Sequence, residues 1–92
     1  MIIISKEYYI NIPSKVLHNK NLKPNSKILY GEIARLSQKD DYCYASNKYL
    51  GYLLNINNKS VSRLLKELKE SGLIKSKEII ECGLTKRYLY II

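Results

Sequence analysis

Basic and hydrogen-bonding side chains gather on one face of the segment that follows Asn57. At about 100° per residue, Lys59, Arg63 and Lys66 lie on one side of a helix, with Ser62 beside them. Ammonium and guanidinium groups bind phosphates, while guanidinium, amide and hydroxyl groups also bond the edges of bases. These residue types at this spacing predict recognition of a polyanion, and Arg63 is best suited to a bidentate contact with guanine.

The other face of the same segment is apolar. Its stripe has the spacing of an amphipathic helix and consists of Val61, Leu64, Leu65 and Leu68. Asn57 can cap the first turn of this helix. Gly72 can end it in the left-handed conformation, and Leu73 can fold back onto the last turn. We therefore expect a helix between Asn57 and Gly72.

A shorter helical pattern precedes this segment. Ser46 can cap its first turn, and Leu50, Leu53 and Leu54 follow at helical spacing. Asn55 tolerates the left-handed conformation and can stop the helix there. Two short helices joined by a tight turn, the second with a basic outer face, form a helix-turn-helix, which we place at residues 46–72. The alternative is a pair of amphipathic helices with solvated charges, but the capped break favours the motif.

Composition supports a polyanionic partner. The 92 residues predict one domain spanning 1–92, with a net charge of +8 from 16 Lys and Arg against 8 Asp and Glu. AT-rich coding would also give abundant Lys, Asn, Ile and Tyr, so the placement of charge counts for more than its sum. Between Asp41 and Glu67 no residue is acidic, and Lys48 falls in that window together with the basic residues of the helix-turn-helix.

Several classes of function are disfavoured. Cys43, Cys82 and His18 are the only cysteines and histidine, too few for a disulfide framework or a four-ligand zinc site. No nucleophile–base pair, carboxylate dyad or Gly-rich phosphate loop is present. We therefore expect no enzyme, cofactor, metal or small-molecule substrate. The apolar stretch at residues 1–4 is too short for a signal peptide or membrane span, so a cytoplasmic protein is expected.

The remaining chain predicts strands and helices around the motif. We expect a strand at residues 7–12, which residues 1–4 either pair with as a hairpin or extend, so that 1–7 form an N-terminal strand extension. A short helix at 14–18 and a helix from Pro24 to about Gln38 follow, with Ile28, Leu29, Ile33 and Leu36 as its buried stripe. Gly31 is expected to let another helix pack closely. Residues 42–45 are expected to join a sheet as a minor strand.

A hairpin is predicted after the helix-turn-helix. Strands at 73–81 and 86–92, joined by a turn at 82–85, form a wing at residues 73–92. Its tip offers contacts to phosphates or to a minor groove, for which we expect the basic and hydroxyl residues Lys75, Lys77, Thr85, Lys86 and Arg87. The alternative is that lysines only guard an exposed strand edge; it weighs equally for Lys75 and Lys77, whereas contact is favoured for Lys86 and Arg87.

These features together resemble the winged helix-turn-helix domains at the N-termini of plasmid and phage replication initiators of low-GC bacteria. The resemblance covers about residues 8–92. It is carried by Ile12–Pro13, Val16–Leu17, Leu22–Pro24, Ser26–Gly31, Tyr42–Ser46, Leu50 and the run LNINNKSVSRLLKELKESGLI. It implies an α+β fold with an N-terminal strand, helices, a recognition helix and a C-terminal β-hairpin wing. The turn glycine usual in that family is Asn55 here.

The resemblance also implies binding of double-stranded DNA at short repeats of a plasmid or phage control site. That site could be a replication origin, a transfer origin or an operator. By position, Asn57 matches the cap of the recognition helix, and Asn58, Lys59, Ser62 and Arg63 match its base- and phosphate-facing positions. No catalytic or helicase-loading domain follows residue 92, so an accessory role in replication, conjugation or transcription regulation is expected rather than an initiator.

The expected DNA-contacting residues lie on the two helices and the wing. They are Lys48, Asn57, Asn58, Lys59, Ser60, Ser62, Arg63, Lys66, Lys75, Lys77, Thr85, Lys86 and Arg87. Because the outer face of the second helix ends in Glu67 and Glu70, docking centred on the wing is a variant of docking centred on this helix.

Three further hypotheses remain beside this reading. Consecutive isoleucines at Ile2, Ile3 and Ile4 cannot all face one small core, so they are candidates for a homodimer interface. A winged helix can also serve as a protein-interaction or dimerisation module without specific DNA binding. Single-strand binding through tyrosines of the outer strands (Tyr8, Tyr88 and Tyr90) is the third, although packing of these rings is favoured.

Overall fold

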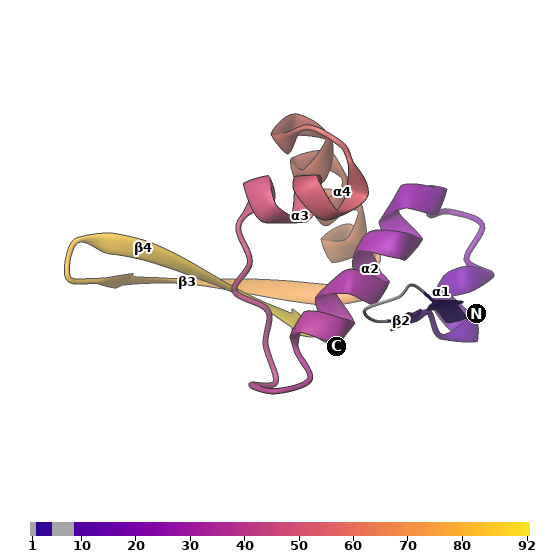
Figure 1. Ribbon diagram of the computed structural model, residues 1–92, viewed down its shortest axis with the longest axis horizontal. Helices are drawn as coiled ribbons and strands as arrows, with labels where there is room; N and C mark the ends of the chain where they lie inside the picture. Colours follow the sequence, from indigo (N-terminus) through magenta and orange to yellow (C-terminus); the bar gives the residue numbers. More distant parts are fainter. Residues whose placement is uncertain (1, 5–8) are drawn as a thin grey trace.

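The computed structural model describes residues 2–4 and 9–92, and Figure 1 shows the arrangement of its helices and strands. The elements follow in the order β1 (Ile2–Ile4), β2 (Tyr9–Asn11), α1 (Ser14–Leu17), α2 (Pro24–Leu36), α3 (Asn47–Leu54), α4 (Asn58–Glu70), β3 (Ile74–Glu81) and β4 (Leu84–Ile91). This order confirms the predicted α+β winged helix-turn-helix. Within the described ranges, no helix has the length and apolar character that crossing a membrane requires.

The N-terminal strands form a hairpin. β1 pairs antiparallel with β2, and Ile3 lies opposite Ile10. Of the two predicted arrangements, hairpin or extension, the structure therefore has the hairpin. The predicted connection at residues 5–7 lies outside the described residues, as does Tyr8.

The helices and the base of the wing enclose a hydrophobic core. α2 runs through its centre and contacts α4, α3, β2 and β4. Leu29 and Ile33 of α2, Leu50 of α3, Leu68 of α4 and Leu89 of β4 are buried there. Full burial of one such side chain contributes about 1.5–3 kcal/mol. The core therefore fixes the relative positions of α3, α4 and the first half of the wing.

α2 follows the prediction at its start and in its core but differs from it at its end and at Gly31. It begins with Pro24 in its first turn. Of the predicted stripe, Leu29 and Ile33 are buried in the core, whereas Ile28 and Leu36 are only partly buried against it. It ends at Leu36, before the predicted Gln38. The close neighbour of Gly31 is not a helix but the N-terminal strand segment: a Cβ at Gly31 would lie 3.1 Å from the Ile10 side chain. The prediction of helix packing at Gly31 was wrong because β2 and the residue after it cross α2 at this point.

The wing has a tighter turn than the predicted one at 82–85. β3 and β4 pair along their whole lengths, from Ile74 opposite Ile91 to Glu81 opposite Leu84. Only Cys82 and Gly83 connect them, and both have positive φ angles, 52° and 78°. Two such residues make the two-residue hairpin turn whose twist matches that of paired strands. The far half of the wing extends away from the helices (Figure 1).

The minor strand predicted at residues 42–45 is a single bridge. Cys43 exchanges both backbone hydrogen bonds with Leu89, each 2.8 Å long. Both side chains are fully buried. The segment that leads into α3 is therefore attached to the edge of β4, close to the base of the wing.

Candidate nucleic-acid interface

The helix-turn-helix at residues 46–72 has the predicted caps. The Ser46 hydroxyl accepts a hydrogen bond of 3.1 Å from the Tyr49 N–H and begins α3. Asn55 ends α3 in the left-handed conformation, with φ 58° and ψ 45°. The Asn57 side chain accepts a bond of 2.9 Å from the Ser60 N–H and begins α4. Both helices therefore start and stop at residues whose side chains or backbone conformations satisfy the helix ends.

Gly51 holds the turn against α3 and was missed by the sequence reasoning. The Ile56 N–H donates to the Gly51 carbonyl at 2.9 Å. A Cβ at Gly51 would lie only 2.5 Å from the Ile56 carbonyl oxygen, so a larger residue cannot fit without backbone movement. The available signal was a glycine inside a helical pattern one turn before the break, which indicates close approach of another backbone.

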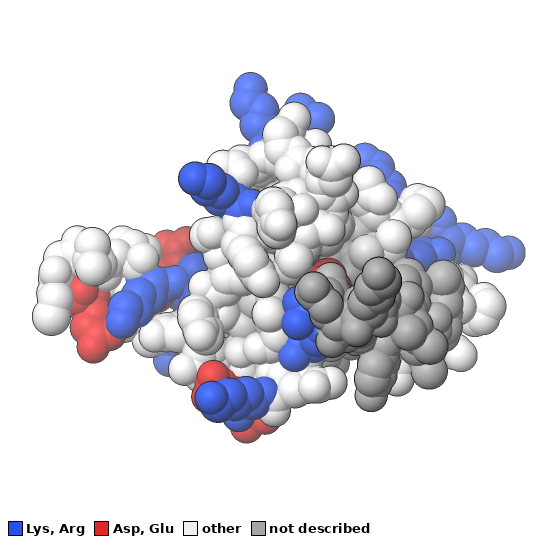
Figure 2. Space-filling model, viewed as in Figure 1, with Lys and Arg blue, Asp and Glu red and all other residues white. Residues whose placement is uncertain are grey.

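The apolar face of α4 is buried and its basic face is exposed, as the sequence predicts. Its apolar stripe is buried and consists of Val61, Leu64, Leu65 and Leu68. Its opposite face is exposed and carries Asn58, Lys59, Ser62, Arg63 and Lys66, while Ser60 is half-buried beside the cap. Lys48 of α3 is exposed as well. In Figure 2, basic side chains project from the end of the molecule that α3 and α4 form, whereas the wing carries both signs of charge.

Glu67 does not belong to this exposed face. Its Oε1 accepts a hydrogen bond of 2.7 Å from the backbone N–H of Lys23, the residue before α2. The carboxylate therefore serves the start of α2 from another helix. The expectation that Glu67 closes the basic face with negative charge is wrong, whereas Glu70 is exposed.

The C-terminal end of α4 follows the prediction, with Gly72 at φ 72° and the Leu73 N–H bonded to the Leu68 carbonyl at 3.1 Å.

Arg87 joins the wing to the helix-turn-helix. Its guanidinium donates to the Asn47 side-chain oxygen at 2.5 Å and to the Ala45 carbonyl at 2.8 Å. The Asn47 amide in turn donates to the Ser62 hydroxyl on α4 at 2.9 Å. Burial lowers the pKa of the Arg87 guanidinium, which stays charged at neutral pH. The predicted wing-tip contact therefore lies in the middle of the wing, opposite Glu78, where it is half-buried and bonded within the protein.

The other predicted wing residues divide between the two faces of the hairpin. Lys75, Lys77 and Lys86 share the face that carries Tyr88 and Tyr90, since directly paired residues point the same way. The Lys75 ammonium lies 5.6 Å from the centre of the Tyr90 ring. Thr85 lies on the opposite face, together with Arg87. Lys75, Lys77, Thr85 and Lys86 are all exposed.

Lys86 is paired within the wing. Its ammonium lies 3.5 Å from a carboxylate oxygen of Glu81, and both side chains are more than half exposed. Such a pair contributes little to stability and exchanges readily with other ions.

The tip of the wing is apolar, which the sequence reasoning did not note. Ile80 and Leu84 are 77% and 66% exposed, and Ile79 is also exposed. Cys82 is an exposed free cysteine at the turn. Near the tip, apolar and polar residues no longer alternate along the strand, since Ile79 and Ile80 are consecutive. This loss of alternation was the available sign that both faces of the tip are solvated.

Tyr88 and Tyr90 pack as the sequence favoured. Tyr42 contacts the Tyr88 ring edge-on, with ring centres 4.7 Å apart, and its centre lies 6.0 Å from that of Tyr90. In the described part of the chain, no group of three or more His, Cys, Asp or Glu side chains is placed to hold a metal ion.

Comparison with known proteins agrees with this geometry. Residues 20–74, more than half of the chain, match a protein family described as "Helix-turn-helix domain". No curated protein sequence matches the chain. Among solved structures, the chain is similar to one described as "N-Terminal domain of DNA binding protein", with a TM-score of 0.68 and 25% identity, over 95% of this chain and 76% of that one.

Two further structures share the fold. One is described as "Structure of Rep-DNA complex", with a TM-score of 0.67 and 22% identity, over 95% of this chain and 76% of the other. The second is a possible transcriptional regulator from Methanosarcina mazei, with a TM-score of 0.62 and 16% identity, over all of this chain and 74% of the other. The predicted winged helix-turn-helix fold is thereby confirmed, and the predicted resemblance holds for the fold shared with the protein of the Rep–DNA complex.

Proposed function

Because this chain belongs to the helix-turn-helix domain family, we propose that it binds double-stranded DNA in a sequence-specific manner without catalysing a reaction. The proposed targets are short repeats in a plasmid or phage control site, either a replication origin, a transfer origin or an operator. The role is accessory or regulatory. The observation that carries the proposal is the exposed polar and basic face of α4, held between the caps of a helix-turn-helix.

α4 would enter the major groove with its N-terminal half. Lys59 and Arg63 lie one turn apart on the exposed face and reach toward base edges or phosphates. Asn58 and Ser62 supply hydrogen-bonding groups beside them. Asn57 sits at the positive end of the helix dipole, where a DNA phosphate is favoured. With Glu67 bonded to the start of α2, Lys66 extends this surface by one further turn.

Docking centred on the helix has better support than docking centred on the wing. Arg87 is bonded to α3, and the tip that would lead a wing into a groove carries Ile80 and Leu84. Lys75, Lys77, Thr85 and Lys86 would follow the phosphate backbone along the flank of the wing. Lys48 would do so beside α3.

The test is a titration with a pool of duplexes from the protein's own replicon, followed by selection of the bound sequences. We expect enrichment of a short repeated site and an affinity that falls steeply with salt, because bound lysines and arginines release counterions. Arg63→Ala should lose about 1–3 kcal/mol of binding free energy at the selected site. Lys15→Ala on α1 is the matched control, since it removes the same charge outside the motif. Equal losses for both variants would contradict specific recognition by α4.

A second candidate function is a protein-interaction or dimerisation module without specific DNA binding. The exposed apolar tip of the wing favours it, because Ile80 and Leu84 would bury apolar area against a partner. Charge reversal of Lys59 and Arg63 separates the two functions. DNA binding predicts that this double variant loses its activity in the replicon, whereas the interaction module predicts that activity is kept.

We further propose that the protein forms a homodimer through β1, where Ile2, Ile3 and Ile4 lie. Among the described strands, β1 pairs only with β2, so its other edge is free to pair with the β1 of a second copy. Two-fold symmetric dimers match the repeats at which such proteins bind. Deletion of residues 1–5 should give a monomer by light scattering. A dimer that persists after the deletion would refute this interface.

A further inference from the structure

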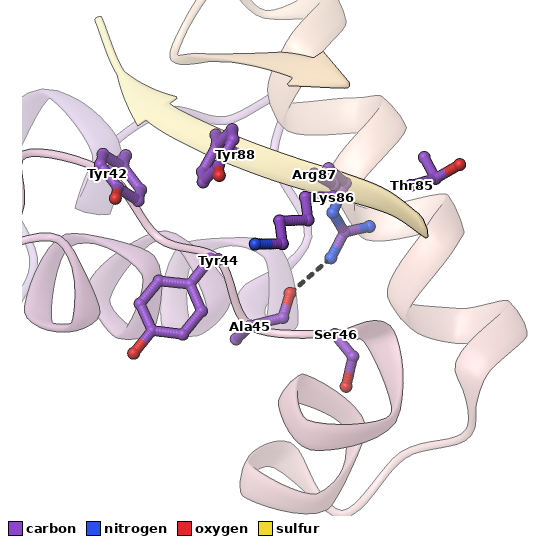
Figure 3. Close-up of a pocket in the computed structure, with 8 residues that line it drawn as sticks. All are labelled: Tyr42, Tyr44, Ala45, Ser46, Thr85, Lys86, Arg87 and Tyr88. Carbon is purple, nitrogen blue, oxygen red and sulfur yellow. Dashed lines mark hydrogen bonds between the residues drawn. The ribbon is translucent and has the colours of Figure 1, made fainter. Parts of the chain in front are cut away.

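A hollow lies beside the middle of the wing, between residues 42–46 and residues 85–88 of β4. It has a volume of about 560 Å³ and is open to solvent (Figure 3). Its walls are formed by Tyr42, Tyr44, Ala45, Ser46, Thr85, Lys86, Arg87 and Tyr88. The volume falls within the range of small-ligand sites, about 300–1,000 Å³. None of these lining residues is acidic, so the hollow is both aromatic and positively charged.

Two of its tyrosines are packed, and the third is not. Tyr42 and Tyr88 meet edge-on and support each other. Tyr44, by contrast, is 69% exposed, and its ring centre lies 6.2 Å from that of Tyr42 at a tilted angle of 59°. Tyr44 also lines a second hollow of about 570 Å³, together with Leu36 and Tyr49. The Tyr44 ring thus stands between two hollows and offers planar aromatic surface to a ligand.

The polar groups of the hollow fit an anion next to an aromatic ligand. Lys86 forms an exposed contact with Glu81, which a phosphate can displace. Ser46 provides a hydroxyl group, which keeps its own proton for donation while it caps α3. A planar ring that stacks on tyrosine, joined to a phosphate that binds lysine, is the chemistry of a nucleotide.

The hollow is linked to the proposed DNA-binding face by two hydrogen bonds. Its wall residue Arg87 bonds Asn47, and Asn47 bonds Ser62 on the exposed side of α4. Bases inside a duplex are stacked on their neighbours and cannot also stack on a side chain. The occupant must therefore be unpaired.

We infer that the hollow binds an unpaired nucleotide adjacent to the duplex held by α4, with the base stacked on Tyr44 and its phosphate on Lys86. This inference rests on the proposed DNA binding and adds a preference for DNA that is partly single-stranded. A frayed end, a gap or a melted stretch of duplex would present such a nucleotide.

The experiment compares the duplex used to test DNA binding with the same duplex carrying an oligothymidine tail, on either strand and at either end. Fluorescence anisotropy should show that at least one tail raises the affinity on the order of fivefold or more, the effect expected for stacking of one base. Tyr44→Ala should abolish this gain without changing the affinity for the blunt duplex. Tyr44→Phe keeps the ring and should retain the gain.

Tyr52→Ala is the control, because Tyr52 is 79% exposed on α3 and lines neither hollow. It should retain the full gain from the tail. Equal affinity of the wild-type protein for blunt and tailed duplexes, or equal loss in Tyr44→Ala and Tyr52→Ala, would overturn the inference and leave duplex binding intact. Failure to bind the blunt duplex at any salt concentration would instead overturn the proposed function itself.

Discussion

The guanidinium of Arg87 on β4 bonds the side-chain oxygen of Asn47 on α3 at 2.5 Å, across forty residues of sequence. The same Asn47 donates to Ser62 on α4 at 2.9 Å. Three elements that each contribute to the proposed DNA surface are thus joined by two hydrogen bonds. The angle between the wing and α4 is set by side chains of the protein before any DNA is bound.

Arg87→Ala should destabilise the folded protein by about 1–3 kcal/mol, because it removes two hydrogen bonds from a charged, half-buried group. Denaturant unfolding measures this loss. Lys77→Ala, an exposed change on the same wing, is the control and should leave the midpoint unchanged. Combining Arg87→Ala with Asn47→Ala should cost less than the sum of the single changes, since the pair shares one bond. Strict additivity would mean that this bond contributes nothing.

Gly51→Ala should destabilise the protein, although alanine has the higher helix propensity. The new Cβ would lie 2.5 Å from the Ile56 carbonyl, and backbone cannot move away as a side-chain end can. Gly31→Ala meets side-chain atoms of Ile10 and Ile12 at 3.1 Å or more, and the gain of about 1 kcal/mol in propensity offsets much of that contact. Thermal unfolding should therefore rank Gly51→Ala well below Gly31→Ala. The reverse order would show that the α3 turn yields more easily than the contact of α2 with Ile10.

The two cysteines should differ in their reaction with an alkylating agent. Burial raises the pKa of the Cys43 thiol, so at a given pH less of it is the reactive thiolate, and the folded protein also shields it. Cys82 is exposed at the wing turn and should be modified in the native protein. Mass spectrometry should find one modification per chain at mildly alkaline pH and two after unfolding. Native modification of both thiols would contradict the attachment of residue 43 to β4.

Glu67→Ala should reduce stability by about 1 kcal/mol, because the Lys23 N–H loses its acceptor. Glu67→Gln keeps an oxygen that can accept this bond and should lie closer to the wild type. Glu70→Ala is the matched control, an exposed acidic residue on the same helix. Denaturant unfolding of the three variants tests this order. If Glu67→Ala instead tightens DNA binding without a loss of stability, Glu67 faces the DNA after all.

The features predicted from sequence are those governed by neighbours along the chain. The caps at Ser46 and Asn57 bond N–H groups three residues away, and the left-handed turn at Asn55 depends on that residue alone. The buried stripe of α4 follows from helical periodicity. These rules are local, so the pattern of residue types was sufficient to place residues 46–72.

The features that were missed depend on residues brought together by folding. Glu67 bonds a backbone group 44 positions away, and Arg87 bonds groups about as distant. Neither residue differs in type from a solvated surface charge, and therefore composition and spacing contain no sign of the partner. The wing turn was placed too broadly for a different reason. A cysteine rarely adopts a positive φ, as Cys82 does here, so only Gly83 indicated the turn and a longer loop was predicted.

The wing can act as a lever. The bridge between Cys43 and Leu89 holds the wing near its base and Arg87 holds it at its middle, whereas its end at Cys82 lies roughly 17 Å beyond Arg87, at about 3.3 Å per residue. A rotation of the wing by about ten degrees about the Arg87 contact would displace Cys82 by about 3 Å over this distance. A small adjustment in the Arg87 contacts would thus be amplified into a displacement comparable to the length of a hydrogen bond. A reporter group attached to the Cys82 thiol would report this displacement of the wing tip directly.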